Sequence, residues 1–464
     1  MKKTSWGLAL LTLFACNQKD PSQVQFNGTI ENPEGKTIVV NSSSQSDTLT
    51  LDENGNFQGT LSLSKATYAT LKHGKENTKM FLIPGKDLQI KLNTQEFDES
   101  LTYEGENADI NNYLAKLFLL NETITPDIRK LFSMEEAAFI SKIDSIYEVK
   151  LRLFNELKNQ NLKLDPNFTK YETARLLYDW AKNYSWYPGY YAYLSGNREY
   201  QPSEQFNSYR KKINLNNAEI LEVEEYQNFI NEHIGSLAEK IMKADESYEK
   251  NMTGYTKAKF VAIEKNITDK EVISYLTYAA TKDYVGRNGA NADKEIIAQF
   301  KKQCTNQQWI TKVDKKLAKW AKLAKGQPAF DFDAEDIEGN KVALSDLKGK
   351  YVYVDVWATW CGPCRGELPY LEKLEKEFHG KNVTFVSISV DDNKEAWKKM
   401  VTKKQMKGIQ LHAAKAWKSS ICKDYMINGI PRFMLFDMEG KIINVNAPRP
   451  SGNIKEVLNK LENI

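Results

Sequence analysis

Hydrophobic and polar residues alternate along residues 24–95, for example at Val24, Phe26, Leu61 and Leu63. A period of two residues is typical of strands with one buried face. Turn sequences rich in Asn, Asp, Pro and Gly separate the alternating runs. These turns are Asn32-Pro33-Glu34-Gly35, Asp52-Glu53-Asn54-Gly55 and Pro84-Gly85. The pattern predicts a small, all-β, antiparallel sandwich or barrel over residues 24–105.

The apolar spacing changes to the period of an α-helix over residues 106–325, with Phe139, Ile143 and Ile146 as an example. N-capping residue types predict where several of these helices begin. The predicted starts are Ser133 with Glu136, Asp165 before Pro166, Thr268 with Glu271, and Thr305 with Gln308. Gly326-Gln327-Pro328 then ends the helical pattern. We therefore expect a mostly helical middle domain.

Large aromatic residues crowd into one short part of this helical domain. They are Tyr178, Trp180, Tyr184, Trp186, Tyr187, Tyr190, Tyr191 and Tyr193. One interpretation is an aromatic surface for a sugar or peptide ligand. We favour the other, in which these side chains pack between helix ends, because large aromatic residues mostly fill cores and interfaces.

Strands and helices alternate over residues 326–464. Apolar runs at 351–357, 383–390 and 433–436 indicate strands, and an amphipathic helix at 368–378 separates the first two. This alternation predicts parallel pairing in an α/β sheet. A hairpin is expected over 329–340. A helix near 392–393, a short apolar piece at 409–411 and a helix near 416–425 are expected between the second and third strands.

Composition narrows the functional classes. The 464 residues are 41% hydrophobic and 11% aromatic, so sizeable cores are expected. A net charge of +3 gives no broad basic field, so the protein is not expected to bind nucleic acid. Five cysteines are too few for a fold held together by disulfides. Their positions are Cys16, Cys304, Cys361, Cys364 and Cys422.

The first 16 residues, MKKTSWGLALLTLFAC, have the order of a secretory signal peptide. Leu13-Phe14-Ala15-Cys16 resembles the bacterial lipobox, in which cleavage precedes a cysteine that is then lipidated. We predict a lipoprotein signal peptide at 1–15, lipidation of Cys16 and a polar tether over 16–23. An ordinary signal peptide with a chance cysteine is the alternative. The expected location is the outer membrane, facing the periplasm, with exposure at the cell surface as the other arrangement.

The sequence Trp360-Cys361-Gly362-Pro363-Cys364 follows a predicted buried strand and opens a helix. Two intervening residues place the cysteines close enough for a disulfide. Cys361 falls at the helix N-terminus, where the N–H groups and the helix dipole stabilise a thiolate. We therefore assign Cys361 to attack a substrate disulfide and the more shielded Cys364 to resolve the mixed disulfide. No metal is expected, because a structural zinc site needs four ligands and the four histidines are scattered.

These residues resemble the thioredoxin family, and its TlpA-like branch in particular, over residues 328–464. The string WCGPC at 360–364 matches the family's active site, and residues 352–359 match the strand before it. The resemblance implies a thioredoxin-like α/β domain whose active-site loop includes Trp360, Gly362, Pro363 and Ile430. The long stretch between Cys364 and Pro431 is similar to the inserted β–α unit of TlpA-like proteins. Residues 24–105 resemble, loosely, a β-rich module of unknown function that precedes such domains.

Three more residues receive roles from this resemblance. Asp355 occupies the position of a buried carboxylate that carries protons for the resolving thiol; the alternative is a strand-end aspartate with no catalytic part. Glu367 matches an acidic position of TlpA-like reductases, although a glutamate in the first helical turn also suits the helix dipole. Pro431 matches a cis-proline that packs against the active-site disulfide and shapes the substrate groove.

We expect a membrane-anchored periplasmic thiol-disulfide oxidoreductase that needs no cofactor besides its redox-active dithiol. The Gly-Pro dipeptide and Ile430 match reducing relatives, which favours a reductase of disulfides in exported proteins that is recharged by a membrane electron donor. The upstream domains would supply substrate choice or a homodimer interface. The alternatives are a disulfide isomerase and a binding lipoprotein whose thioredoxin domain is accessory; a peroxiredoxin is less favoured. Cys304 and Cys422 are predicted to be buried thiols.

Overall fold

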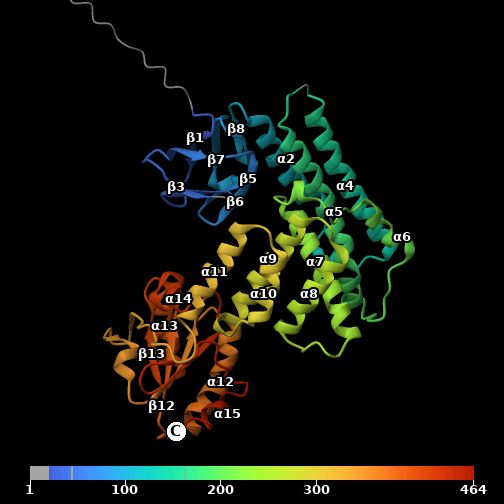
Figure 1. Cartoon of the computed structure of the whole chain (residues 1–464). Coiled ribbons are helices and arrows are strands. Elements are labelled where there is room, and N and C mark those ends of the chain that lie inside the picture. The colour runs from blue at the N-terminus through green and yellow to red at the C-terminus, as the bar shows by residue number, and fades with distance from the viewer. Residues whose placement is uncertain (1–19, 43–44, 161) are drawn as a thin grey trace, which may run out of the picture. The chain divides into compact units, whose positions relative to one another are not determined.

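The computed structural model describes residues 20–42, 45–160 and 162–464 (Figure 1). The predicted signal peptide at 1–15, Cys16 and the first part of the predicted tether lie outside the described residues. The chain divides into two compact units. One extends to Lys240 and includes Ala262–Val272, and the other comprises Ile241–Val261 and Ile273–Ile464. Within the described ranges, no helix is both long and apolar enough to cross a membrane.

Two four-stranded sheets that share one apolar core form the N-terminal part of the first unit, as the alternating pattern predicted. Their orders are β4-β1-β7-β8 and β3-β2-β5-β6. The strands are β1 (Gln23–Glu31), β2 (Thr37–Ser42), β3 (Ser46–Thr50), β4 (Asn56–Ser62), β5 (Thr67–His73), β6 (Glu76–Leu82), β7 (Leu88–Asn93) and β8 (Thr102–Glu104). Val24, Phe26 and Ile30 of β1 alternate into the core, with polar residues between them facing out.

One feature of this sandwich corrects the antiparallel prediction. Strands β1 and β7 pair in parallel, with Phe26 opposite Leu88 and Ile30 opposite Leu92. The alternating pattern specifies which face of each strand is buried, and this is the same for either direction of pairing. The long connection through the other strands, rather than the pattern, sets the direction.

The middle of the chain is helical, as predicted, and Figure 1 shows α4 and α5 as long neighbouring helices. The helices are α1 (Phe97–Ser100), α2 (Ala108–Ile124), α3 (Ile128–Phe132), α4 (Glu136–Lys158), α5 (Pro166–Ser195), α6 (Glu204–Asn207), α7 (Glu224–Ala244), α8 (Met252–Asn266), α9 (Lys270–Asn288), α10 (Lys294–Gln303) and α11 (Gln307–Ala321). Asp165 caps α5 as predicted, because its carboxylate accepts hydrogen bonds from the N–H groups of Asn167 and Phe168.

Three predicted helix starts are wrong in detail. Ser133 ends α3 instead of capping α4, since its N–H already donates to the carbonyl of Arg129. Thr268 and Thr305 are not N-caps either, because in each case the next residue caps the helix. The side chain of Asp269 caps α9 and that of Asn306 caps α11. Asp and Asn rank above Thr as N-caps, so the neighbouring residue takes the position.

The aromatic side chains of α5 mostly fill the core, which agrees with the interpretation that they pack between helices. Tyr178, Trp180, Tyr184, Tyr187 and Tyr191 are buried, and only Tyr190 and Tyr193 of the eight are largely exposed. The buried rings contact rings from other segments of the chain, some stacked and some edge-on. The hydroxyl or indole groups then find polar partners; for example, Trp180 Nε1 and Tyr184 OH both donate to Asp144. This arrangement leaves no continuous aromatic face on the described part of α5.

A seven-stranded sheet forms the C-terminal domain, in the order β10-β9-β13-β12-β11-β14-β15. Its strands are β9 (Ala334–Glu335), β10 (Lys341–Val342), β11 (Tyr351–Trp357), β12 (Val383–Ser389), β13 (Ile409–His412), β14 (Arg432–Phe436) and β15 (Ile442–Asn444), and its helices are α12 (Gly362–Glu377), α13 (Lys394–Lys404), α14 (Ser420–Asp424) and α15 (Ile454–Leu458). Strands β11, β12 and β13 are parallel, whereas β14 runs antiparallel to β11. The predicted α/β fold, the hairpin and the inserted β–α unit are confirmed.

Helices α12 and α15 cover one face of this sheet. Leu371 and Leu374 of α12 and Ile454 of α15 share a core with Tyr351 and Tyr353 of β11. Because side chains alternate across a strand, Asp355 points to the same face as these two tyrosines. The fold therefore places this carboxylate beneath the helix that begins at the cysteine pair.

Candidate active site

The cysteine pair lies where β11 ends and α12 begins. Cys361 is the N-cap residue of α12, and its Sγ accepts a hydrogen bond from the Cys364 N–H at 3.2 Å. A disulfide joins the two residues, with the Cα atoms 5.3 Å apart. Helix N-termini carry unpaired N–H groups and a partial positive charge, so this position favours a thiolate when the disulfide is reduced. Both sulfur-bearing residues are buried, Cys364 slightly more than Cys361.

The rim around the disulfide is open on one side. Gly362 and Pro363 are exposed, and apart from the neighbouring residues and the backbone of its own helix, no atom lies within 4 Å of where a Cβ of Gly362 would be. The Trp360 side chain is 58% exposed, which is a large exposure for a tryptophan. Another polypeptide can therefore approach Cys361 from this side.

The predicted proline reaches the same end of the sheet. The register of β11 and β14 pairs Val356 with Arg432, so the preceding residue, Pro431, lies beside the end of β11 where the cysteine motif starts. The Ile430–Pro431 peptide bond is cis, as the family resemblance implied. Both residues are half-buried, and together with Gly362 and Trp360 they complete the predicted active-site loop.

Asp355 is buried in the sheet below the cysteine helix. Its side chain is 3% exposed, and its Oδ1 atom has no hydrogen-bond partner among the described residues. Burial raises the pKa of this carboxyl well above its usual value, and the negative charges of Glu367 and Glu375 on α12 raise it further. A raised pKa makes this buried carboxyl easier to protonate than an exposed aspartate, and a proton carrier beside a thiol needs to take up a proton.

Glu367 is also buried, but its carboxylate is bound to the chain beyond β15. It accepts hydrogen bonds from the Ser451 N–H at 3.0 Å and from the Ser451 hydroxyl at 2.9 Å. The Arg449 guanidinium lies 3.9 Å away. Glu367 therefore ties α12 to the 449–451 segment while it contributes negative charge near Asp355. These contacts support a positioning role more than direct contact with a substrate.

Sequence reasoning missed a polar network that holds the loop before the cysteines. Asp391 is buried and accepts hydrogen bonds from the Thr359 N–H and hydroxyl, at 2.9 and 2.7 Å, and from the Ser389 hydroxyl at 2.7 Å. His412 Nε2 lies 2.8 Å from the Asp391 carbonyl. A signal was available: Asp391 directly follows the strand that was predicted to lie parallel to β11, and the carboxyl ends of parallel strands meet at one edge.

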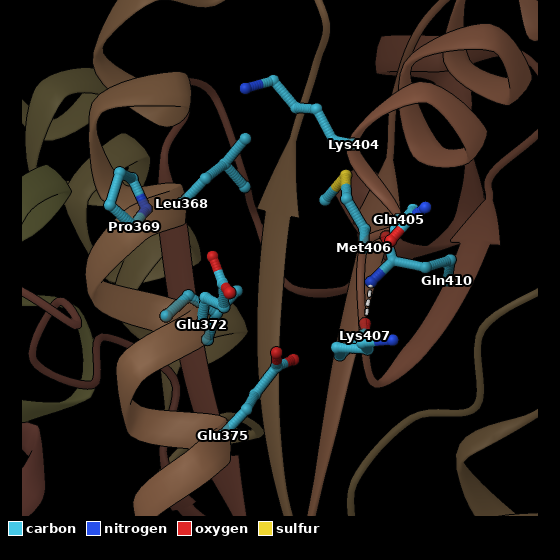
Figure 2. Close-up of a pocket in the computed structure, with 10 residues that line it drawn as sticks. Leu368, Pro369, Glu372, Glu375, Lys404, Gln405, Met406, Lys407 and Gln410 are labelled. Atoms are coloured by element: carbon cyan, nitrogen blue, oxygen red, sulfur yellow. Dashed lines mark hydrogen bonds between the residues drawn. The ribbon is translucent and has the colours of Figure 1, made fainter.

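A cleft of about 150 Å³ lies between α12 and the turn after α13 (Figure 2). Leu368, Glu372 and Glu375 face it from the helix, and Lys404 and Met406 from the opposite side. Burial and the neighbouring Glu372 charge raise the pKa of Glu375 to about 7. The cleft is not lined by either cysteine of the pair. Glu375, which lines the cleft, nevertheless affects the site, because its negative charge raises the pKa of Asp355.

The two other cysteines that the structure describes are not part of this disulfide. Cys304 and Cys422 are buried and outside the disulfide, as predicted, and they are not joined to each other. Burial raises the pKa of the Cys422 thiol, which lowers its reactivity. In the portion of the chain that the structure describes, no group of three or more His, Cys, Asp or Glu residues could hold a metal ion.

A thioredoxin-like sheet with a cysteine pair at the start of a helix defines a thiol-disulfide oxidoreductase domain. Residues 324–461 match the Redoxin family model. The chain is 31% identical over 145 residues to the thiol-disulfide oxidoreductase ResA of Bacillus cereus, which covers 31% of this chain and 82% of that protein. With ResA of Bacillus subtilis it is 31% identical over 123 residues, covering 26% and 67% respectively.

A crystal structure of the thioredoxin domain of a thiol-disulfide oxidoreductase from Bacteroides vulgatus is 36% identical in sequence, with a TM-score of 0.28, and covers 30% of this chain and 97% of that one. The matches to these two ResA proteins span most of each relative's length, and the residues that match the Redoxin model include the cysteine pair. The chain belongs to the redoxin family through this C-terminal domain, and it is a thiol-disulfide oxidoreductase.

Proposed function

We propose that this oxidoreductase is a lipid-anchored reductase of disulfides in exported proteins, working in the periplasm. The observation that carries the proposal is the Cys361–Cys364 disulfide at the N-terminus of α12, with an open rim on the Cys361 side. The Gly-Pro dipeptide between the cysteines and Ile430 before the cis-proline favour the reducing direction, because both match reducing relatives. In an oxidising compartment such a protein must be recharged by a membrane thiol-disulfide electron donor.

The proposed reaction moves two electrons and two protons from the dithiol to the substrate. The Cys361 thiolate attacks one sulfur of a substrate disulfide, a mixed disulfide forms, and the other substrate sulfur leaves as a thiolate that takes up a proton. Cys364 loses its proton, with Asp355 as the acceptor, and attacks the Cys361 Sγ atom. The second substrate sulfur leaves as a thiolate and takes up the proton held by Asp355, and the Cys361–Cys364 disulfide remains. The proton taken up by the first substrate sulfur balances the one that Cys361 released to water when its thiolate formed.

The Cys364→Ser variant is expected to trap substrates. Cys361 can still attack, but no second thiol is present to release the mixed disulfide, so covalent complexes should accumulate in cells. They would be detected as bands that disappear on reduction, and mass spectrometry would identify the trapped proteins. The matched control is the Cys361→Ser, Cys364→Ser double variant, which should trap nothing.

Other outcomes of the trapping experiment separate the alternatives. If the trapped proteins carry scrambled disulfides that wild type rearranges without net reduction, the protein is an isomerase. If cells that carry Cys361→Ser behave as wild type while deletion of the gene has a phenotype, the upstream domains act as a binding lipoprotein and the reductase proposal is wrong.

Replacing Cys16 by serine is expected to release the protein from membranes. The proposed anchor consists of several acyl chains on Cys16, and each buried methylene contributes about 0.8 kcal/mol to membrane binding. Membrane fractionation and labelling with a clickable fatty acid measure the effect, with Cys304→Ser as the control. A Cys16→Ser protein that stays in the membrane fraction would contradict the proposed anchor.

A further inference from the structure

An exposed aromatic pair stands beside the active-site disulfide. The Trp360 and Trp417 rings are 6.3 Å apart between centroids, and the two side chains are 58% and 40% exposed. Trp360 directly precedes Cys361, the attacking cysteine, and Trp417 contacts Trp360. The two rings come from segments that are far apart in the sequence, and neither is needed to fill the core. Exposed tryptophans next to a reactive group are typical of surfaces that bind another molecule.

The backbone that presents Trp417 is held in an unusual conformation. Lys415 and Ala416 both have positive φ angles, 70° and 45°, which are unfavourable for residues with a Cβ. The Lys418 N–H donates to the Lys415 carbonyl at 2.8 Å and the Ser419 N–H to the Ala416 carbonyl at 3.0 Å. The Ala416 side chain is buried, which anchors the turn. Such conformations persist where the surrounding structure enforces them, and they concentrate at functional sites.

The residues next to Trp417 in the sequence carry positive charge. Lys415 and Lys418 flank it in the chain, both are exposed, and neither forms an ion pair with any residue in the described ranges. Arg365, one residue beyond Cys364, is exposed and is likewise free of ion pairs with described residues. Unpaired basic groups beside an apolar surface favour a partner that carries negative charge next to apolar side chains.

We propose that Trp417, with Trp360, forms a platform for a substrate polypeptide that carries an aromatic or large aliphatic side chain next to its cystine and an acidic residue nearby. The proposal rests on the reductase function proposed above, and it makes Trp417 a residue that determines specificity. The substrate side chain would lie on the two indole rings, which exclude water from it. Lys415 and Lys418 would attract the acidic residue. Cys361 would then meet the substrate sulfur in a favourable orientation.

Two oxidised peptides that differ at one position test the platform. Each contains one intramolecular disulfide and one glutamate, and the residue beside the reactive cysteine is phenylalanine in one and serine in the other. Pre-reduced full-length protein is mixed with each peptide, and the rate constant for peptide reduction is measured in a single turnover. Wild type is expected to reduce the phenylalanine peptide about tenfold faster, and Trp417→Ala should lower that ratio to about twofold or less.

Controls separate a platform from a general defect. Tyr370→Ala removes another exposed aromatic residue, 52% exposed and about 13 Å further along α12 from Cys361, and it should keep the wild-type ratio. Trp417→Phe should keep most of it. In Lys415→Glu, Lys418→Glu, replacing the peptide's glutamate by lysine should speed the reaction instead of slowing it, and the effect should weaken with added salt.

Failure of the inference can be distinguished from failure of the proposed function. If wild type reduces both peptides at the same rate, or if Trp417→Ala slows both equally, the platform is wrong while the reductase stands. If wild type reduces neither peptide, the reductase proposal itself fails. If Trp417→Ala changes the oligomeric state of the full chain in sedimentation experiments and leaves the ratio unchanged, the rings form a contact between copies and the platform is overturned.

Discussion

Cys361→Ser is expected to lower the rate of insulin reduction to that of dithiothreitol alone. A serine hydroxyl is not deprotonated at neutral pH and cannot form a mixed disulfide, so the loss should be complete. The structure gives the physical reason for choosing this residue: Cys361 is the N-cap of α12 and lies on the open side of the site. The helix N-terminus lowers the pKa of a thiol there and raises its thiolate fraction.

The matched control is Cys422→Ala, in the same domain. This thiol is buried, its pKa is raised by burial, and it is outside the disulfide, so its removal should leave insulin reduction within about twofold of wild type. The turbidity assay with catalytic dithiothreitol measures both variants. A Cys361→Ser protein that retains clear activity would show that the pair is not the redox centre.

Asp355→Asn is expected to slow turnover by roughly a hundredfold while it makes the folded protein more stable at neutral pH. Loss of a proton acceptor for the resolving thiol costs about 10²-fold in rate or more. The stability effect has the opposite sign because burial and two nearby carboxylates raise the pKa of Asp355 in the folded state. Ionising it is therefore unfavourable in the fold compared with the unfolded chain.

The pH dependence follows from the direction of that shift. Below the ordinary carboxyl pKa of about 4, Asp355 is protonated in both the folded and unfolded states, so wild type and Asp355→Asn should have similar stability. As the pH rises from there towards the raised pKa, wild type loses stability and the variant does not. Thermal unfolding of the oxidised proteins at pH 4 and pH 8 measures the difference. Glu395→Gln, an exposed change on α13 at a residue that forms no ion pair with any described residue, is the control.

Two observations would contradict this account of Asp355. If wild type and variant are equally stable at pH 8, ionisation of Asp355 does not destabilise the folded state. The second is the rate at which Cys364 resolves the mixed disulfide, measured by rapid quenching. If Asp355→Asn leaves this rate unchanged, Asp355 is a strand-end aspartate with no catalytic part. Stability and resolution rate report on separate properties, so the two results need not agree.

Local patterns were sufficient to predict the parts of the fold that depend on local chemistry. The alternation of Val24 and Phe26 predicted a strand, and Asp165 before Pro166 predicted a helix start. These succeed because side-chain period and capping geometry act over a few residues. Thr268 and Thr305 failed because a better capping residue, Asp269 or Asn306, follows each of them. Competition between neighbours cannot be resolved by matching one motif.

Contacts between distant segments required the tertiary structure. The parallel pairing of β1 with β7 depends on a long connection, and an alternating pattern does not encode strand direction. The Asp391–Thr359 hydrogen bonds and the Trp360–Trp417 contact join segments that are distant along the chain. Glu367 shows the same limit: it was placed in the first turn of the helix but lies in the second turn of α12, and its bonds to Ser451 were not foreseen.

Spacing and residue type alone were enough to predict a dithiol at a helix N-terminus after a buried strand, because that chemistry is specified by a few neighbouring residues. The small number of cysteines likewise predicted a fold that is not held together by disulfides. The surroundings of the dithiol became known only from the folded chain: they are the buried carboxylate of Asp355, the hydrogen bonds that hold Thr359, and the exposed tryptophans on the rim. Desolvation and shape depend on which distant segments meet, and folding alone brings those segments together.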